Sequence, residues 1–283
     1  MRRVGVAAPI VDVWKMGATS VEFLRVERSG GVVTVVMSRP EKKNAVNLAM
    51  WHELAETFTS IERAHADRVM VLTGDGGDFC SGADLASLTG GDTLDFMSDA
   101  SEAARTLHAM TIPTIAKVDG VAVGAGWNLA LGCDLVVATE RARFSQIFVR
   151  RALSVDMGGS WLLPRLVGLQ KAKEIAYFGD MYSAQEAADL GLVTRVCAPS
   201  EIDITVDSMA ERLAAGPARA LSLTKQLLNT AVDGGSMEQA LRLESQAQVN
   251  NIGGEDAAEA KAAFLEKRSP VFGARAALSG AAG

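Results

Sequence analysis

The sequence predicts an α/β fold followed by a helical C-terminal segment. Strand-like and helix-like segments alternate between residues 21 and 139, and this alternation implies a mainly parallel sheet with helical covers. Beyond about residue 160 the apolar residues recur mostly at helical spacing. The chain has 283 residues, 48% of them hydrophobic and 22% charged, so it can bury a sizeable core as one large domain or two small ones.

The N-terminal half carries the strand signals. Two valine-rich segments, 21–28 and 31–38, flank Ser29-Gly30-Gly31, which is typical of a β-hairpin. Residues 47–65 place apolar side chains at helical spacing, with Asn47 as the expected N-cap. The further expected elements are a strand at 69–73, a helix at 94–110, a strand at 114–118, a helix from about 125 and a strand at 134–139.

The C-terminal part is expected to be helical. Residues 183–193 begin with a serine at the N-cap position and end near Gly191, a common helix terminator. Four more helices are expected at 203–215, 217–231, 236–250 and 255–268. The predicted organisation is a loose lead-in at 1–19, a core at 20–200, a helical module at 201–270 and a flexible tail at 271–283.

Composition argues against several classes of protein. The net charge of −6 and the isoelectric point near 5.2 argue against a nucleic-acid binder, because such proteins carry a basic footprint. Three cysteines without a CxxC pair argue against a disulfide scaffold, and three scattered histidines argue against a metal site. Without an apolar run of about 18 residues or a signal-peptide pattern, we expect no membrane span and a cytoplasmic protein.

Two glycine-rich turns follow predicted strands. In residues 118–139 the turn contains Gly120, Gly124 and Gly126, and it leads into a short helix. In residues 68–85 the strand leads to a turn of small residues at 81–83. Each turn can present a free backbone N–H to the same oxygen, which is the design of an oxyanion hole. Taken alone, the glycines favour plain tight packing of a helix on a strand, because a lone glycine pattern is weak evidence for a site.

Five sequence blocks follow one another along the chain: RPEKKNAVN (39–47), DFCSGADL (78–85), GVAVGAGWNLALGCDL (120–135), DMGGSWLLPRLVG (156–168) and AFLEKRSPVF (263–272). Together and in this order they resemble the crotonase superfamily, the enoyl-CoA hydratase/isomerase family. The resemblance implies a crotonase-like (ClpP/crotonase) fold: a spiral of repeated ββα units with a helical C-terminal trimerisation module. It also implies an acyl-CoA thioester substrate, no separate cofactor, and a homotrimer or a hexamer built as a dimer of trimers.

The resemblance assigns roles to particular positions. The oxyanion N–H groups fall on Ala83 and Ala125, and the contacts to the CoA group fall on Lys43, Phe264 and Lys267. Phe264 and Lys267 are expected to act on CoA bound to a neighbouring subunit, although a solvated cation at a helix end is the alternative for Lys267. Further substrate contacts are expected from Ala45, Ser81, Gly82, Asp84, Leu85, Gly124, Trp127, Asn128 and Phe148.

The sequence departs from a hydratase at its acid/base residues. A hydratase of this family uses two glutamates to activate water, and the matching positions here hold Asn128 and Phe148. Neither side chain exchanges a proton near neutral pH, so we do not expect hydration by the usual mechanism. Asn128 is expected either to hydrogen-bond water or substrate, or to serve as a packing amide within its helix.

Asp156 is the remaining candidate for proton transfer. Its motif matches isomerases and dehalogenases of the family, and GGSWLLPRLVG resembles the epoxyphenylacetyl-CoA isomerase type. The alternative is an ordinary aspartate N-cap for the following helix. One carboxylate suffices for a double-bond shift if an apolar wall raises its pKa. Phe148 and Trp127 are candidates for that wall, with core packing as their alternative role.

Three functions remain open from the sequence. The first is an acyl-CoA isomerase with Asp156 as the acid/base, the second an enoyl-CoA hydratase that uses other residues, and the third a CoA-thioester binding protein with little catalysis. The acyl group is expected to lie against segment 86–110. The side chains expected there are Leu88, Leu94, Phe96 and Met97.

Overall fold

The computed structural model describes residues 19–20, 22–87 and 93–273. Leu88, nearly all of the predicted lead-in at 1–19 and most of the predicted tail at 271–283 lie outside the described residues. In the described part, no helix is long and apolar enough to cross a bilayer.

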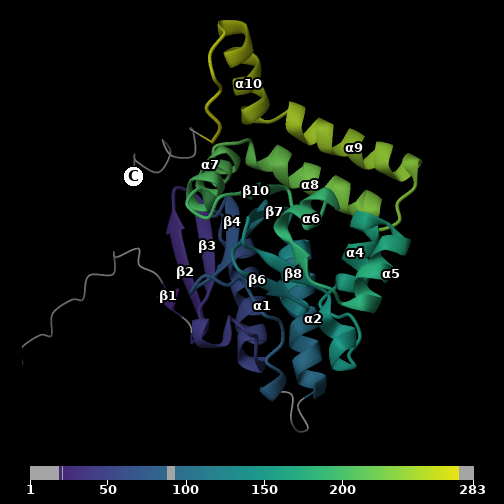
Figure 1. The fold of residues 1–283 in the computed structure, drawn as a ribbon. Coiled ribbons are helices and arrows are strands. Elements are labelled where there is room, and N and C mark those ends of the chain that lie inside the picture. Colours follow the sequence, from purple (N-terminus) through teal and green to yellow (C-terminus); the bar gives the residue numbers. More distant parts are fainter. Residues whose placement is uncertain (1–18, 21, 88–92, 274–283) are drawn as a thin grey trace, which may run out of the picture.

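A seven-stranded sheet forms the centre of the molecule, in the order β1-β2-β3-β4-β5-β7-β10 (Figure 1). The strands from β3 to β10 pair in parallel, and β1 and β2 pair antiparallel at one edge. The predicted parallel sheet is therefore confirmed, together with its N-terminal hairpin. The bounds are β1 Thr19–Ser20, β2 Leu24–Ser29, β3 Val32–Met37, β4 Val69–Gly74, β5 Thr114–Val118, β7 Leu135–Thr139 and β10 Arg195–Cys197.

A second, three-stranded sheet consists of short strands that sequence patterns did not indicate. β6 (Val121–Val123) and β8 (Arg143–Ser145) pair in parallel, and β9 (Tyr182–Ser183) pairs antiparallel with β8. β6 follows β5, and β8 follows β7, so the chain turns from the large sheet into the small one twice. These turns produce the repeated ββα units of a crotonase-like fold and place loops of both sheets side by side.

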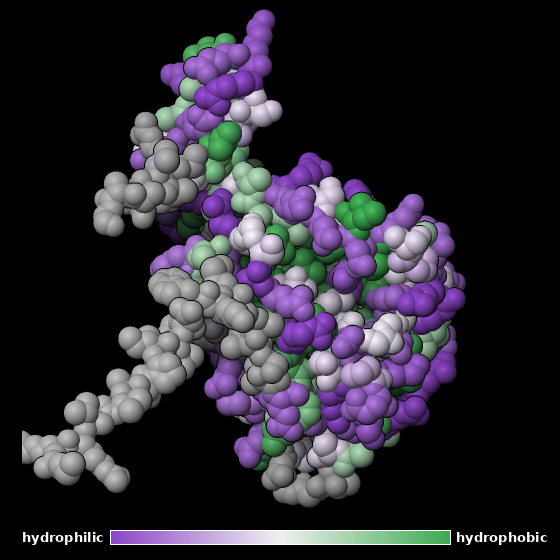
Figure 2. Space-filling view, turned by 90° about the vertical axis from the view of Figure 1, so that its left-hand side faces the viewer, coloured by the Kyte–Doolittle hydropathy of each residue, from purple (hydrophilic) through white to green (hydrophobic). Residues whose placement is uncertain are grey.

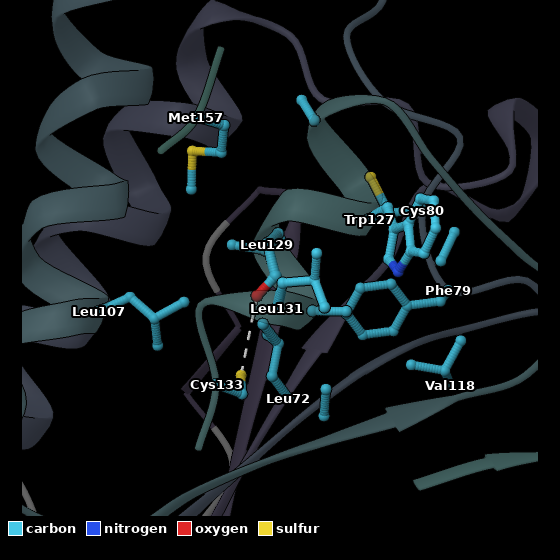
Figure 3. Close-up of a cluster of buried hydrophobic side chains, with 14 of the residues drawn as sticks. Leu72, Phe79, Cys80, Leu107, Val118, Trp127, Leu129, Leu131, Cys133 and Met157 are labelled. Carbon is cyan, nitrogen blue, oxygen red and sulfur yellow. Dashed lines mark hydrogen bonds between the residues drawn. The ribbon is translucent and has the colours of Figure 1, made fainter. Parts of the chain in front are cut away.

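Helices cover both faces of the large sheet. The main core lies against α1 (Leu48–Arg63), α2 (Thr93–Ala109) and α3 (Ala125–Leu131), and a smaller core lies under α7 (Ile202–Ala214). Figure 3 shows part of the main core, in which Trp127 and Phe79 lie over strand residues such as Val118. The other helices are α4 Gly159–Val167, α5 Leu169–Phe178, α6 Ala184–Asp189, α8 Ala218–Val232, α9 Met237–Ile252 and α10 Glu255–Glu266, and the 3₁₀ helices are η1 Pro40–Lys42, η2 Leu85–Ser87 and η3 Ile147–Arg151.

Local signals account for several element boundaries. The hairpin turn uses Gly30 and Gly31 at φ 58° and 83°, the left-handed region that glycine tolerates at low cost. The side chain of Asn47 accepts a hydrogen bond from the N–H of Met50 at 2.9 Å, which confirms the predicted N-cap of α1. Ser183 and Glu186 form a capping box that begins α6.

α8 lies along the main body, where Lys225 bonds to Asp134 and to the carbonyl of Ile112, and α9 and α10 continue outward from it. α8 has no buried residue, and α9 and α10 each have one. Figure 1 shows α10 at the far end of this extension, and in Figure 2 the same end projects from the rounded body. Exposed apolar side chains on these helices include Leu228, Met237, Val249, Ile252 and Phe264.

Candidate active site

A cavity of about 450 Å³ lies where the loops after β4 and β6 meet η3 and the segment before α4. Most of its wall is apolar, and Asp156 is the one carboxylate among its described lining residues. The lining residues are Ser81, Gly82, Ala83, Leu85, Thr93, Phe96, Met97, Val123, Gly124, Ala125, Ile147, Phe148, Arg151, Leu153, Ser154, Val155 and Asp156.

Backbone pairing joins the two glycine-rich loops directly. The N–H of Cys80 donates to the carbonyl of Val121 at 2.9 Å, and the N–H of Val123 donates back to the carbonyl of Cys80 at 3.0 Å. A Cβ at Gly82 would lie 2.7 Å from the oxygen of Val123, so only glycine allows this approach. The loops predicted to share one oxygen are thus in contact.

Ala83 and Ala125 occupy matching places in these two loops. Beside Ala83, the carbonyl of Gly82 and the N–H of Asp84 both pair with the backbone of Val46. Ala125 is the first residue of α3, so its N–H lies at the start of that helix. Within the described ranges, neither N–H donates a hydrogen bond to a protein atom. Both residues line the cavity, so it has two backbone amides that are free to serve a bound oxygen.

A tight turn places Asp156 on the cavity wall. The turn continues through Met157 and Gly158, both at positive φ (49° and 75°), and closes with the N–H of Gly159 donating to the carbonyl of Asp156 at 2.9 Å. A non-glycine residue at positive φ, such as Met157, is strained and needs support from its surroundings. Asp156 therefore precedes α4 without capping it, because the N-cap of α4 is Gly158 and no side chain caps it.

The environment of Asp156 favours its protonated form. Its Oδ1 is buried, and no hydrogen-bond partner lies within reach among the described atoms. Burial raises the pKa of this carboxyl from 3.8 to about 6, opposed by a smaller effect of a backbone hydrogen bond. A carboxyl with a pKa near 6 takes up and returns a proton near neutral pH, as an acid/base residue requires.

Asn128 does not line the cavity, which corrects the expectation that it contacts substrate. Its side chain is 1% exposed, and Nδ2 donates to the carbonyl oxygen of Asp156 at 2.9 Å. Its Oδ1 accepts a hydrogen bond from Nε2 of Gln146 at 2.7 Å. Sequence reasoning missed Gln146, because a single glutamine between β8 and η3 gives no periodic or motif signal.

Two apolar residues expected at the wall lie elsewhere in this structure, and for Trp127 the alternative of core packing applies. Trp127 is fully buried against Phe144 and Tyr182, and Figure 3 shows it inside the core beside Cys80. Its ring faces away from the cavity. Periodicity could not indicate which side of the short helix α3 faces the site, because every residue of this helix is buried. Leu94 is 83% exposed near the start of α2 and does not line the cavity, whereas Phe96, Met97 and Phe148 do.

Three residues expected to contact substrate or CoA lie in and beside the Ala83 loop. Lys43 is exposed and forms a 3.5 Å ion pair with Asp78. Asp84 forms an ion pair with Arg39 at 3.1 Å, and the same arginine donates to the carbonyl of the buried Ala45 at 2.5 Å. Arg39 therefore ties the Ala83 loop to the segment that carries Lys43. Asp84 and Ala45 are not among the lining residues.

Phe264 and Lys267 lie on α10, remote from this cavity in the same chain (Figure 1). Phe264 is 82% exposed, and Lys267 ends the helix in a left-handed conformation. Neither side chain serves the cavity of its own chain in this structure. Contact with the cavity of another copy remains the prediction made from the sequence.

Other reactive groups offer little chemistry at the site. Burial raises the pKa of Cys80 to about 12, so this thiol next to the Ala83 loop is not a nucleophile near neutral pH. His108 contacts Trp161 edge to face with ring centroids 4.9 Å apart, beside a separate small cavity. In the described part of the chain, no cluster of three histidine, cysteine, aspartate or glutamate residues is placed to hold a metal ion.

Comparison with known proteins identifies the family. The enoyl-CoA hydratase/isomerase family profile matches residues 27–275. The chain is 35% identical to the 1,2-epoxyphenylacetyl-CoA isomerase of Escherichia coli over 89% of this chain and 98% of that protein. It is 32% identical to a short-chain-enoyl-CoA hydratase of Clostridium acetobutylicum over 86% and 94%, respectively. Hydratase names are more frequent than isomerase names among such relatives.

Solved structures agree with the sequence comparison. The crystal structure of an enoyl-CoA hydratase from Bacillus anthracis has a TM-score of 0.85 and 31% identity, covering 89% of this chain and 99% of that chain. A likeness over this share of both chains agrees with the predicted crotonase-like fold. The chain therefore belongs to the enoyl-CoA hydratase/isomerase family of the crotonase superfamily.

Proposed function

We propose that this protein is an acyl-CoA isomerase that moves a double bond, or carries out a related proton shift, with Asp156 as its single acid/base. The observation that carries the proposal is the placement, on a mostly apolar cavity, of a carboxyl with a pKa of about 6 whose Oδ1 has no hydrogen-bond partner among the described atoms. The free amides of Ala83 and Ala125 line the same cavity, so one bound thioester can meet all three groups.

The proposed mechanism balances with one proton. The thioester oxygen accepts hydrogen bonds from the N–H groups of Ala83 and Ala125. The carboxylate of Asp156 removes a proton from one carbon of the acyl chain, and the C–H electron pair shifts to give an enolate whose negative oxygen the two amides stabilise. Asp156 then returns the proton to a different carbon, which moves the double bond. The reaction needs no separate cofactor, because CoA is part of the substrate.

Hydration is the second candidate, because most named relatives are hydratases. Hydration by the usual two-carboxylate mechanism requires acid/base groups at the positions of Asn128 and Phe148. Phe148 presents an apolar ring to the cavity, and both functional atoms of Asn128 are engaged elsewhere. A hydratase would therefore have to use Asp156 alone, and a catalytically weak CoA-thioester binding protein would not use it at all.

Assembly into a trimer, or a hexamer as a dimer of trimers, completes the proposal. α8, α9 and α10 carry exposed apolar side chains and bury almost nothing of their own. Contact with other copies would cover these faces and bring Phe264 and Lys267 to the CoA of a neighbouring subunit. Sedimentation of the purified protein measures this directly, and a monomer at micromolar concentration would contradict it.

A paired ultraviolet assay tests the reaction. One cuvette holds a 3-enoyl-CoA and the other a 2-enoyl-CoA of equal length, and the absorbance of the conjugated thioester is followed. An isomerase raises the band in the first cuvette and leaves the second nearly unchanged. Rapid loss of the band in the second cuvette would identify a hydratase and contradict the proposed mechanism. Aromatic acyl-CoA substrates extend the assay if both cuvettes are silent.

The variant Asp156→Asn connects the reaction to the residue. The amide has nearly the same shape but cannot take up the proton, so turnover should fall by at least about 10³-fold while CoA binding stays within about threefold. Isothermal titration with CoA supplies the binding value. Undiminished isomerisation by this variant would exclude Asp156 as the acid/base. If the wild-type protein binds CoA but turns over no substrate, and Asp156→Asn binds CoA equally well, the binding-protein alternative is favoured.

A further inference from the structure

We propose that Gln146 and Asn128 form a positioning pair that holds the turn of Asp156 and aims its carboxylate into the cavity. The inference rests on the proposed function, since a positioning pair matters for turnover only if Asp156 performs the proton transfer. Neither amide lines the cavity proposed to hold the substrate, so Asn128 acts through the backbone of Asp156 and Gln146 acts through Asn128.

The carbonyl of Asp156 fixes the orientation of both amides. A carbonyl oxygen only accepts, so Asn128 must turn its NH₂ group toward it, and the contact is 2.9 Å. Oδ1 of Asn128 then faces Gln146, which must in turn present its own NH₂ group, at 2.7 Å. Both side chains are almost completely buried, at 1% and 0% exposure, so solvent does not compete for these bonds.

The shape of the turn is matched to Asn128. A Cβ at residue 159 would lie 2.3 Å from Nδ2 of Asn128, so Gly159 makes room for the amide. Gly158 supplies a positive φ, and Met157 adopts one despite its side chain. A strained turn persists only where its surroundings hold it, and the bond from Asn128 is the side-chain contact that holds this one.

The pair also connects the parts of the proposed site. Asn128 lies on α3, whose first residue is Ala125, and Gln146 directly precedes η3, which carries Phe148. The two hydrogen bonds thus fix the position of Asp156, the proposed base, relative to the N–H of Ala125 and the ring of Phe148. Among the described atoms Oε1 of Gln146 is buried without a hydrogen-bond partner, which costs stability, so the bond that its Nε2 donates to Asn128 is the favourable contact of this side chain.

The same geometry explains the asparagine in place of a hydratase glutamate. An ionised glutamate at residue 128 only accepts, and it would direct negative charge at the carbonyl of Asp156. The position therefore supports either a glutamate acid/base or the amide that braces the Asp156 turn. In this chain it supports the brace.

Two apolar variants test the pair, with Thr114→Val as a matched control. Asn128→Leu keeps the approximate volume and removes both bonds, and Gln146→Met removes only the outer one. We expect kcat to fall about 10- to 100-fold in Asn128→Leu and about 3- to 10-fold in Gln146→Met, with KM for the thioester within about threefold, because a base displaced by about 1 Å loses catalysis rather than binding.

Thr114→Val removes a buried hydroxyl that hydrogen-bonds Asp134 at 2.9 Å, at the start of β5 and away from the cavity. It should lower the thermal midpoint without changing kcat. A pH–rate profile gives a second readout. A loosened turn admits water to Asp156, so the lower limb of the profile should move below pH 6 in Asn128→Leu and Gln146→Met and stay in place in Thr114→Val.

The outcomes separate the two proposals. Loss of turnover in Asp156→Asn together with unchanged kcat in Asn128→Leu and Gln146→Met would overturn the positioning pair and leave the proposed function intact. Full turnover in Asp156→Asn would overturn both. If Asn128→Leu does not fold, Gln146→Met decides the question, and a kcat equal to that of the wild-type protein would overturn the pair.

Discussion

Replacing the Asp156 carboxyl by an amide should remove activity and increase stability. A pKa of about 6 against the ordinary 3.8 means that the folded protein holds this proton about 2 pKa units more tightly than the unfolded chain. At about 1.4 kcal/mol per unit, the ionised carboxylate costs the folded state at most about 3 kcal/mol at pH 7. Asp156→Asn carries no charge at any pH, so we expect it to be about 1–3 kcal/mol more stable at pH 7.

The sign follows from the raised pKa. Well below pH 3.8 the carboxyl is protonated in both states, and the cost disappears. As the pH rises from about 4 to 6, the free energy of unfolding of the wild-type protein should fall relative to that of Asp156→Asn, and above 6 the full difference remains. Proteins that strain or bury a functional group commonly gain stability when it is removed.

Urea denaturation at pH 4.5 and pH 7.5, at one protein concentration, measures the difference. The gap between the two proteins should be larger at pH 7.5. Equal stability at both values, or a less stable variant at pH 7.5, would refute the idea that burial holds an uncompensated carboxylate at the cavity. In the paired ultraviolet assay the same samples should show the opposite order, because the more stable variant is the inactive one.

Three further results are expected. Activity should rise with pH through about 6 and then level off, because the ionised form of Asp156 abstracts the proton; a profile flat from pH 5 to 8 would contradict this. Gly126→Ala would place a Cβ 2.2 Å from the carbonyl oxygen of Cys80, so it should lower stability by at least about 1–3 kcal/mol and reduce kcat. Lys225→Met removes the 2.8 Å partner of Asp134 and should cost about 1–3 kcal/mol in chemical denaturation without changing KM.

Elements with local causes could be predicted from the sequence. Gly30 and Gly31 specify the hairpin turn, and Asn47 specifies the start of α1, because each acts through its own backbone. The short strands β6 and β8 could not be predicted. Three residues are too few to show alternation, and they become strands only because each pairs with a distant segment.

The parts of the candidate site that the backbone forms could be predicted from the sequence. The loops of Ala83 and Ala125 carry glycines whose small size is visible in the sequence, and they do meet at the cavity. The direction of individual side chains was not predictable. Trp127 and Asn128 are neighbours on a helix buried on all sides, and only the packing decides that one enters the core and the other reaches Asp156.

The division between main chain and side chain has a consequence for the evolution of new reactions. The two candidate oxyanion donors are backbone amides, so substitutions at residues 83 and 125 that keep the loop shape leave them intact. The proposed choice of reaction resides in one carboxylate and the side chains that face it. Directed evolution toward new acyl groups can therefore vary positions such as Met97 and Phe148 broadly, while the capacity to polarise a thioester is inherited unchanged.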